Sequence, residues 1–211
     1  MAGKTWEHQI GIIDYGMGNL RSVQKAFAYL GFSADIISDP AQAKASSRLI
    51  LPGVGAFHDA IARLHETEMD KAVLEAAAEG KPILGICLGM QMMFSASVEN
   101  GWDEGLGLFP GTIERLQGGE GLKIPHMGWN TIETKPSILF TGEEKPAVYF
   151  VHSYCASEVT EVTSATCEYG QVFTAAVERG NVCATQFHPE KSGDAGLAML
   201  RRFATWEGEA C

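Results

Sequence analysis

The chain is organised around the sequence Lys81-Pro82-Ile83-Leu84-Gly85-Ile86-Cys87-Leu88-Gly89-Met90-Gln91. An apolar run, typical of a buried strand, leads into a cysteine that has a glycine two residues away on each side. A segment typical of a helix follows it. This layout is that of a nucleophile elbow, with cysteine at the position where similar hydrolases carry serine. It predicts a fold, a nucleophile and an oxyanion site together.

The residues before the elbow alternate between apolar runs and segments with helical spacing. We expect strands at residues 9–14, 34–37, 48–51 and 82–86, and helices at 20–30, 56–64 and 71–78. The last of these strands is apolar without alternation, as a central parallel strand covered on both faces should be. The order predicts an α/β fold with a doubly wound, mostly parallel sheet flanked by helices.

The residues after the elbow have a different character. The expected strands, at 149–151, 172–178 and 182–187, are shorter, and a turn at 179–181 joins the last two. They predict an antiparallel extension of the sheet in the C-terminal half, before a final helix at 194–206. Because there is no internal repeat, low-complexity tract or linker, we expect one domain over residues 1–211.

Composition excludes several classes of function. The formal net charge of −10 argues against nucleic acid and anionic membranes as partners. No apolar run approaches the roughly 18 residues of a membrane span. The first eight residues contain no apolar segment of a secretory signal, so a cytoplasmic protein is expected.

The cysteines and histidines do not form a metal-binding pattern. The five cysteines are scattered and include no Cys-x-x-Cys pair, and there is no His-Glu-x-x-His motif. We therefore expect no metal, no cofactor and reduced thiols. The cysteines are Cys87, Cys155, Cys167, Cys183 and Cys211.

Cys87 stands where a strand passes into a helix, and the partial positive charge of a helix N-terminus favours a thiolate. The backbone N–H of Leu88 would point toward the oxygen of an acyl group on this sulfur. A second oxyanion donor is expected from Gly53 or Val54, which follow the neighbouring strand. The alternative is a buried core cysteine packed between glycines.

A general base is expected at His188. Residues two apart on extended chain point the same way, so Glu190 would share a face with His188 if Pro189 stays extended. The carboxylate would then orient the imidazole, as in a catalytic triad. The alternative is a surface turn. The remaining candidates, His8, His58 and His65, lie near the terminus or in expected surface helices and are interpreted as bystanders.

These features together resemble the class I, or triad-type, glutamine amidotransferase family over nearly the whole chain. Four further segments are similar to the glutaminase-subunit family of imidazole glycerol phosphate synthases. The segments are Asp14-Tyr15-Gly16-Met17-Gly18-Asn19-Leu20, Pro125-His126-Met127-Gly128-Trp129-Asn130, Tyr149-Phe150-Val151-His152-Ser153-Tyr154 and His188-Pro189-Glu190-Lys191-Ser192.

The resemblance implies a reaction and a set of roles. Cys87 would attack the side-chain amide of glutamine, His188 would protonate the departing ammonia, and Glu190 would orient His188. Leu88 and Val54 would stabilise the oxyanion. The residues that would hold glutamine are Gln91, Glu99, His152, Ser153 and Tyr154. Their alternatives are an ordinary helix residue for Gln91, a solvated loop charge for Glu99 and strand packing for the other three.

The resemblance also implies a partner, a cyclase subunit with a (β/α)₈-barrel fold that uses the ammonia in a heterodimer. Residues Trp129, Asn130, Tyr149 and Lys191 match family positions near that interface; the alternatives are a core aromatic for Trp129 and a solvated charge for Lys191. Three other functions stay open: a related glutaminase that supplies a different synthase, a catalytically silent regulatory subunit, and a general cysteine hydrolase.

Overall fold

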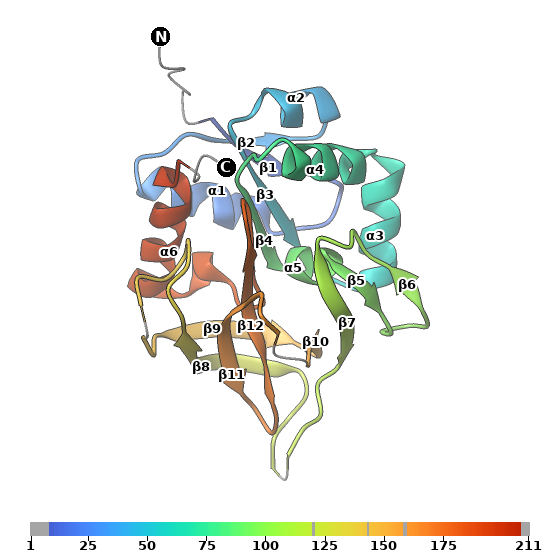
Figure 1. The fold of residues 1–211 in the computed structure, drawn as a ribbon, viewed down its shortest axis with the longest axis vertical. Coiled ribbons are helices and arrows are strands. Elements are labelled where there is room, and N and C mark those ends of the chain that lie inside the picture. Colours follow the sequence, from blue (N-terminus) through green and yellow to red (C-terminus); the bar gives the residue numbers. More distant parts are fainter. Residues whose placement is uncertain (1–8, 120, 143, 158–159, 208–211) are drawn as a thin grey trace.

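A parallel sheet forms the centre of the molecule (Figure 1). The computed structural model describes residues 9–119, 121–142, 144–157 and 160–207. Short apolar strands make up the centre of this sheet, and all of them except the strand at its edge are fully buried, as expected for strands that helices cover on both faces. In spatial order they are β2 (Ala34–Ile37), β1 (Ile10–Ile13), β3 (Arg48–Gly53), β4 (Ile83–Cys87) and β13 (Val182–Thr185).

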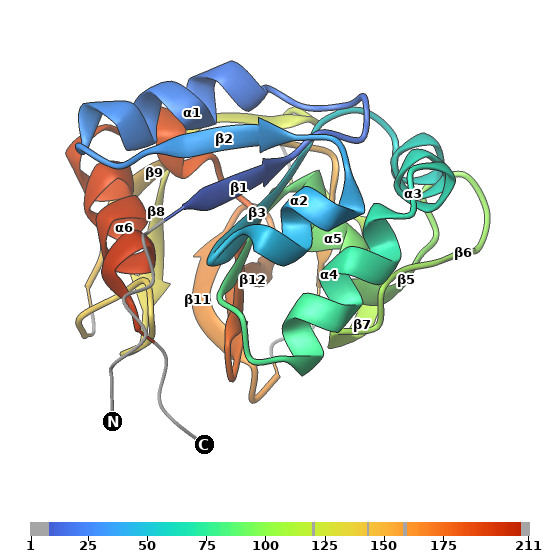
Figure 2. The ribbon, with the colours of Figure 1, turned by 90° about the horizontal axis from the view of Figure 1, so that it is seen from above.

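Helices cover both faces of this parallel sheet. On one side α1 (Leu20–Tyr29) and α6 (Gly193–Thr205) pack side chains such as Phe27 and Phe203 against the strands. On the other side lie α2 (Pro40–Ala45), α3 (Phe57–Glu66), α4 (Met69–Ala78) and α5 (Leu88–Met92). Figure 2 shows β1 and β2 between these two layers.

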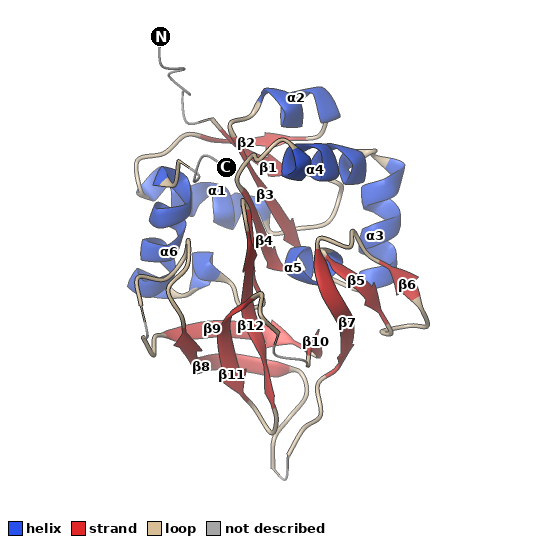
Figure 3. Ribbon diagram, viewed as in Figure 1, coloured by secondary structure: helices blue, strands red, loops and turns tan. Residues whose placement is uncertain are grey.

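The sheet continues beyond β13 with antiparallel pairs, except for one parallel pair near its far edge. Strand β12 (Val172–Arg179) pairs antiparallel with β13, and β10 (Tyr154–Ala156), β7 (Phe109–Arg115), β5 (Phe94–Ser97) and β6 (Asp103–Glu104) follow in that order. A branch leads from β12 through β11 (Thr163–Glu168) and β8 (His126–Thr134) to β9 (Ala147–His152). Figure 3 shows this branch at the end of the molecule away from α2 and α4.

The predicted doubly wound sheet with an antiparallel extension is confirmed. The sequence prediction missed the short helix α2 and the strands β5, β6, β7, β8, β10 and β11. Strand β8 was missed because Met127 and Trp129 are exposed on its outer face, so the burial of its residues does not follow their hydrophobicity. Among the described residues, no helix is long and apolar enough to cross a membrane.

Candidate active site

The elbow holds Cys87 in a strained conformation at the end of β4. Its φ of 55° and ψ of −110° are unusual for a residue with a side chain, and such strain persists only where packing enforces it. Packing here requires glycine at position 89, because an added Cβ would lie 1.8 Å from the carbonyl oxygen of Leu51. The close approach of α5 to β3 thus fixes the turn that presents the Cys87 sulfur.

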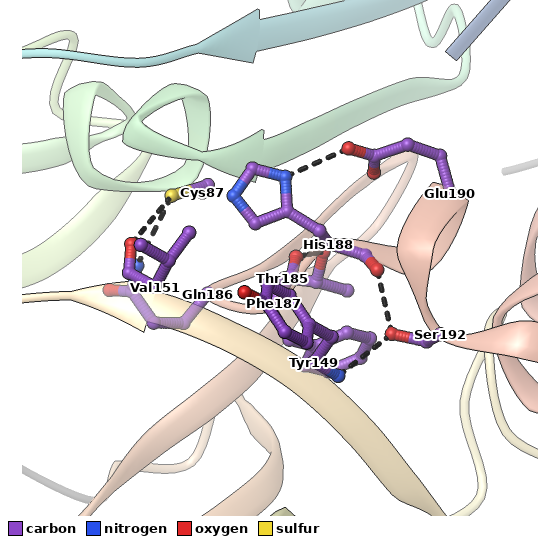
Figure 4. Close-up of polar contacts among 9 residues, drawn as sticks. All are labelled: Cys87, Tyr149, Val151, Thr185, Gln186, Phe187, His188, Glu190 and Ser192. Carbon is purple, nitrogen blue, oxygen red and sulfur yellow. Dashed lines mark hydrogen bonds and ion pairs between the residues drawn. The ribbon is translucent and has the colours of Figure 1, made fainter. Parts of the chain in front are cut away.

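Glu190 orients the ring of His188. The Nδ1 atom of His188 lies 2.8 Å from Oε1 of Glu190, and their side chains are 3% and 1% exposed (Figure 4). The expected route to this contact was wrong. Residues Pro189–Lys191 form a 3-10 turn, η1, instead of extended chain, and this turn folds the carboxylate back toward the imidazole.

The other ring nitrogen of His188 faces Cys87. Figure 4 shows Nε2 turned toward the sulfur, and no other described residue gives this buried nitrogen a hydrogen bond. Burial lowers the pKa of His188, but the neighbouring Cys87 and Glu190 outweigh it and raise the pKa to about 9. The site therefore favours the protonated form of His188, which lies between the Cys87 sulfur and the Glu190 carboxyl group.

Strand β3 brings the predicted oxyanion donors beside the nucleophile. Gly53 pairs directly with Cys87, and a Cβ at this glycine would lie 2.7 Å from Oη of Tyr15. Leu88 is the first residue of α5, so its N–H has no acceptor within the helix. Val54 is 41% exposed, and its φ is not positive, since only Glu68 and Cys87 have a positive φ among the described non-glycine residues.

A cavity of about 330 Å³ opens at Cys87. Its size falls in the range of about 300–1,000 Å³ that is usual for small-molecule sites. All five residues predicted to hold a substrate line it, together with the predicted nucleophile, its predicted base and the predicted oxyanion donors Leu88 and Val54. The lining residues are Val54, Gly55, Cys87, Leu88, Gln91, Glu99, Pro125, Val151, His152, Ser153, Tyr154 and His188.

Gln91 is buried, and its side-chain amide nitrogen makes two hydrogen bonds within the protein. Nε2 donates to the carbonyl oxygen of Tyr154 at 2.9 Å and to Oε1 of Gln186 at 3.0 Å. A primary amide has two N–H donors, and these contacts use both. Gln91 therefore offers its carbonyl oxygen to the cavity.

Glu99 brings the only carboxylate among the described residues that line the cavity. Its Oε2 accepts a hydrogen bond of 2.7 Å from the backbone N–H of Phe57, at the start of α3. This contact replaces the side-chain cap that Ala56 does not supply. Oη of Tyr154 donates to the Glu99 carbonyl oxygen at 3.2 Å and ties this loop to the opposite wall.

Behind His152 lies a second buried histidine, His126. Nδ1 of His152 donates to the carbonyl oxygen of Tyr154 at 2.9 Å, and its Nε2 lies 3.1 Å from Nδ1 of His126. The His126 ring is stacked on Tyr169, with centroids 4.0 Å apart. Burial lowers the pKa of both histidines to about 4. The two rings are therefore neutral near pH 7.

The structure separates the four predicted interface residues into two groups. Trp129 and Tyr149 are cross-strand neighbours on the outer face of β8 and β9, and Nζ of Lys191 lies 5.9 Å from the Tyr149 ring centroid. Asn130 is on the opposite face of β8, as alternation along a strand requires. Its amide nitrogen donates to the carbonyl oxygen of Glu168 at 3.0 Å and lies 3.4 Å from Nε2 of His126.

Two of the histidines interpreted as bystanders, His58 and His65 of α3, do not line the cavity. His58 pairs with Asp103, and His65 pairs with Asp70. His8 lies outside the described residues. The described part of the chain contains no group of three or more histidine, cysteine, aspartate or glutamate side chains that could hold a metal ion.

The described cysteines other than Cys87 are buried thiols that do not line the cavity. Burial raises the pKa of Cys155 and of Cys167 to about 12, and that of Cys183 rises well above its ordinary value. They are therefore protonated near pH 7 and poor nucleophiles. Cys211 lies outside the described residues.

Sequence reasoning missed Gln186, which contacts the nucleophile. Nε2 of Gln186 lies 3.9 Å from Sγ of Cys87, and the residue is fully buried. Gln186 precedes His188 by two residues, and the chain bends at Gln186 and Phe187, so strand alternation does not explain why both side chains reach Cys87. The available signal was a polar residue close in sequence to the expected base.

Comparisons with known proteins agree with this geometry. The family Glutamine amidotransferase class-I matches residues 11–205. Three relatives named imidazole glycerol phosphate synthase subunit HisH are similar over almost their whole length. The protein of Rhodopirellula baltica is 49% identical over 93% of this chain and 97% of its own. That of Syntrophotalea carbinolica is 49% identical over 92% and 98%. That of Desulfitobacterium hafniense is 50% identical over 95% of both.

Solved structures share the fold at low sequence identity. A crystal structure of a glutamine amidotransferase superposes with a TM-score of 0.73 at 21% identity, over 93% of this chain and 99% of its own. The structure of PurLQS from Thermotoga maritima gives a TM-score of 0.72 at 21% identity, over 92% and 96%. At this identity the likeness concerns the fold alone.

Proposed function

The chain belongs to the class I glutamine amidotransferase family, and we propose that it is the glutaminase subunit of an imidazole glycerol phosphate synthase. It hydrolyses glutamine and passes the ammonia to a cyclase subunit, which makes imidazole glycerol phosphate and an aminoimidazole carboxamide ribotide. This places it in histidine biosynthesis, as a cytoplasmic protein. The match over residues 11–205 supports one glutaminase domain over the whole chain.

One observation carries the chemical part of the proposal. A strained cysteine, an imidazole and a carboxylate follow one another at the mouth of a cavity, with the imidazole fixed at 2.8 Å by the carboxylate. A packed core cysteine would need neither the positive φ of Cys87 nor a buried ion pair beside it. Those two features favour catalysis over packing.

The geometry supports acyl transfer through a thioester. Cys87 Sγ attacks the side-chain carbonyl carbon of glutamine, and the N–H groups of Leu88 and Val54 or Gly53 receive the developing oxyanion. His188 donates its proton to the departing ammonia. It then takes a proton from water, whose oxygen bonds to the thioester carbonyl carbon while the C–S bond breaks. Glutamate leaves, and the Cys87 sulfur and the protonated imidazole return to their starting state. Glu190 keeps the imidazole oriented through both steps.

The cavity walls fit the charged end of glutamine. The free carbonyl oxygen of Gln91 and the carboxylate of Glu99 are acceptors that suit an α-ammonium group. His152, Ser153 and Tyr154 form the facing wall, where backbone groups position the rest of the substrate. The neutral His152 adds no charge that would repel the ammonium.

A glutaminase of this kind needs an ammonia acceptor, because ammonia released into water is protonated and lost. The exposed face of β8 and β9 suits an interface, since Trp129 is 59% exposed and Met127 is 62% exposed. Lys191 and Tyr149 continue that face. We propose that a cyclase with a (β/α)₈-barrel fold binds there. Asn130 acts from the inner side of the same strand.

The test uses the complex of this chain with its cyclase. Cys87→Ala should abolish glutamine-dependent synthesis of imidazole glycerol phosphate and leave ammonia-dependent synthesis within about twofold, since only the ammonia source is lost. The matched control is Cys155→Ala, which removes a buried thiol outside the cavity and should keep both activities. Equal loss of both activities in Cys87→Ala would mean that Cys87 is structural. Recovery of a different synthase as the bound partner would favour a related glutaminase.

A further inference from the structure

A chain of side-chain amides ends at the nucleophile. The carbonyl oxygen of Tyr154 accepts from Gln91 Nε2 at 2.9 Å, and the same nitrogen donates to Oε1 of Gln186 at 3.0 Å. Nε2 of Gln186 then lies 3.9 Å from Sγ of Cys87, within reach of a hydrogen bond to sulfur. Figure 4 shows this contact as a dashed line.

The direction of every bond in this chain is fixed by its first member. A carbonyl oxygen only accepts, so the side of Gln91 that faces Tyr154 must be its nitrogen. That nitrogen only donates, so Gln186 must turn its oxygen toward Gln91 and its nitrogen toward Cys87. Rotating either amide by 180° would place like groups against each other, and the Cys87 sulfur therefore always faces an N–H donor.

Gln186 and His188 both reach the sulfur from the short segment that follows β13, where the chain bends at Gln186 and Phe187. The imidazole approaches Cys87 from one direction and the amide of Gln186 from another (Figure 4). Gln186 is fully buried, so water does not compete for its N–H.

We propose that Gln186 is a further catalytic residue, which donates a hydrogen bond to the Cys87 thiolate, and that Gln91 is the positioning residue that aims it. The role rests on the proposed glutaminase function. Hydrogen bonds to charged groups are stronger than those to neutral ones. Donation therefore favours the thiolate over the thiol and raises the fraction of enzyme that is ready to attack.

The chain contains a matched control for this contact. Nε2 of Gln171 lies 3.9 Å from Sγ of Cys155, which is the same type of contact at the same distance but on a thiol outside the cavity. Gln186→Met removes the donor at nearly constant volume. Gln186→Glu keeps an acceptor for Gln91 but presents oxygen to the sulfur. Gln171→Met removes a comparable donor from Cys155.

The experiment measures alkylation of Cys87 by iodoacetamide against pH in the complex with the cyclase, with the site identified by mass spectrometry. Gln186→Met should slow alkylation about tenfold at neutral pH and move the midpoint up by about one pH unit. Gln186→Glu should move it further. Within the described part of the chain, His188 and Tyr15 are titratable groups that interact electrostatically with Cys87, and burial together with the Cys87 charge raises the pKa of Tyr15, which stays neutral.

Turnover supplies a second readout. In Gln186→Met the kcat for glutamine should fall in proportion to the alkylation rate while KM changes less than about twofold, because the lost bond acts on the nucleophile. Gln171→Met should leave both profiles unchanged. An unshifted alkylation profile in Gln186→Glu, a variant that keeps size and the bond to Gln91, would overturn the proposal. Alkylation needs no glutamine, so absent turnover in the wild type would instead count against the proposed function.

Discussion

His188 and the His126–His152 pair lie beside the same cavity, but His188 is charged near pH 7 whereas the pair is neutral. The pKa of His188 is raised to about 9, whereas the pKa values of His152 and His126 are lowered to about 4. All three residues are at most 6% exposed. Burial therefore does not distinguish them, and the difference must come from their hydrogen-bond partners.

The partners of His188 and of the pair differ in charge. His188 has a carboxylate at one ring nitrogen and the nucleophilic sulfur beside the other. His152 donates to a neutral carbonyl oxygen, and its second nitrogen accepts from another imidazole. A second proton on His152 would place an N–H against an N–H. Opposite charges favour the imidazolium, and their absence leaves burial to favour the neutral ring.

This difference assigns His188 and the pair different work. In the proposed reaction His188 exchanges protons with the substrate, which requires a group that can hold a charge next to Cys87. The His126–His152 pair keeps a fixed tautomer and so fixes the carbonyl oxygen of Tyr154, the atom that also orients Gln91. In the proposed reaction His188 therefore transfers protons, and the His126–His152 pair holds the wall that would bind the substrate.

The largest expected effect comes from removing the charge that distinguishes His188. Glu190→Gln should lower the kcat for glutamine by about 10²–10⁴-fold, because the amide neither stabilises the imidazolium nor holds the required tautomer. The pKa of His188 should fall from about 9 toward the values of the other pair. Steady-state kinetics with glutamine across pH would measure both changes.

The control for this variant is Glu178→Gln, which changes a carboxylate that accepts from the backbone N–H of Ile138 at 2.6 Å, away from the cavity. It should retain glutaminase activity. Ammonia-dependent synthesis by the complex should survive in both variants. A Glu190→Gln enzyme with near-normal kcat would show that the carboxylate does not set the state of His188.

A smaller effect is expected from the neutral pair as pH falls. Its folded-state pKa values are depressed, so its contribution to stability is present above pH 6.5 and is lost as pH falls toward 4. For His152 alone the loss should reach about 3 kcal/mol of the free energy of unfolding. Denaturant unfolding at several pH values would measure it. In His152→Gln the free energy of unfolding should depend less on pH between 6.5 and 4. The same pH dependence as in the wild type would show that His152 is not the group that titrates there.

The positions of Cys87, His188 and Glu190 were predictable from sequence, because the features that indicate them are local. The elbow is visible in the glycines around Cys87, and His188 and Glu190 are two residues apart. Their contact was predicted for the wrong reason, since η1 is a 3-10 turn where Pro189 was expected to continue an extended chain. Either local path brings the carboxylate to the imidazole, so the residue assignment survived the error.

The contacts of the His126–His152 pair and of Gln91 were not predictable, because they join residues that are distant in sequence. His126 meets His152 only through the register of β8 and β9, in which these two residues are cross-strand partners. Gln91 meets Gln186 across 95 residues. A buried apolar face normally indicates the register of a strand, but strands such as β8 lack a clear one. The sequence pattern therefore did not indicate which residues lie opposite one another.

The smallest expected effect comes from giving the neutral pair a carboxylate. Both ends of the Asn130 amide are fixed, since its oxygen accepts from the N–H of Thr131 at 2.8 Å and its nitrogen donates to the Glu168 carbonyl oxygen. Asn130→Asp would therefore turn an oxygen toward Nε2 of His126. At pH 8 the variant should lose about 2 kcal/mol of unfolding free energy, because two acceptors then face each other without a donor.

Acidification should reverse part of that loss. A protonated His126 would donate from Nε2 to the introduced carboxylate, so the pKa of His126 should rise from its lowered value, and the variant should lose less unfolding free energy than the wild type as pH falls below about 6.5. Asn130→Ala is the matched control, since it removes the same amide without adding charge and should differ from the wild type by a constant amount across pH. Denaturant unfolding of the three proteins between pH 8 and 5.5 would measure these differences. Parallel curves for the two variants would mean that partners do not set the charge of the buried histidines.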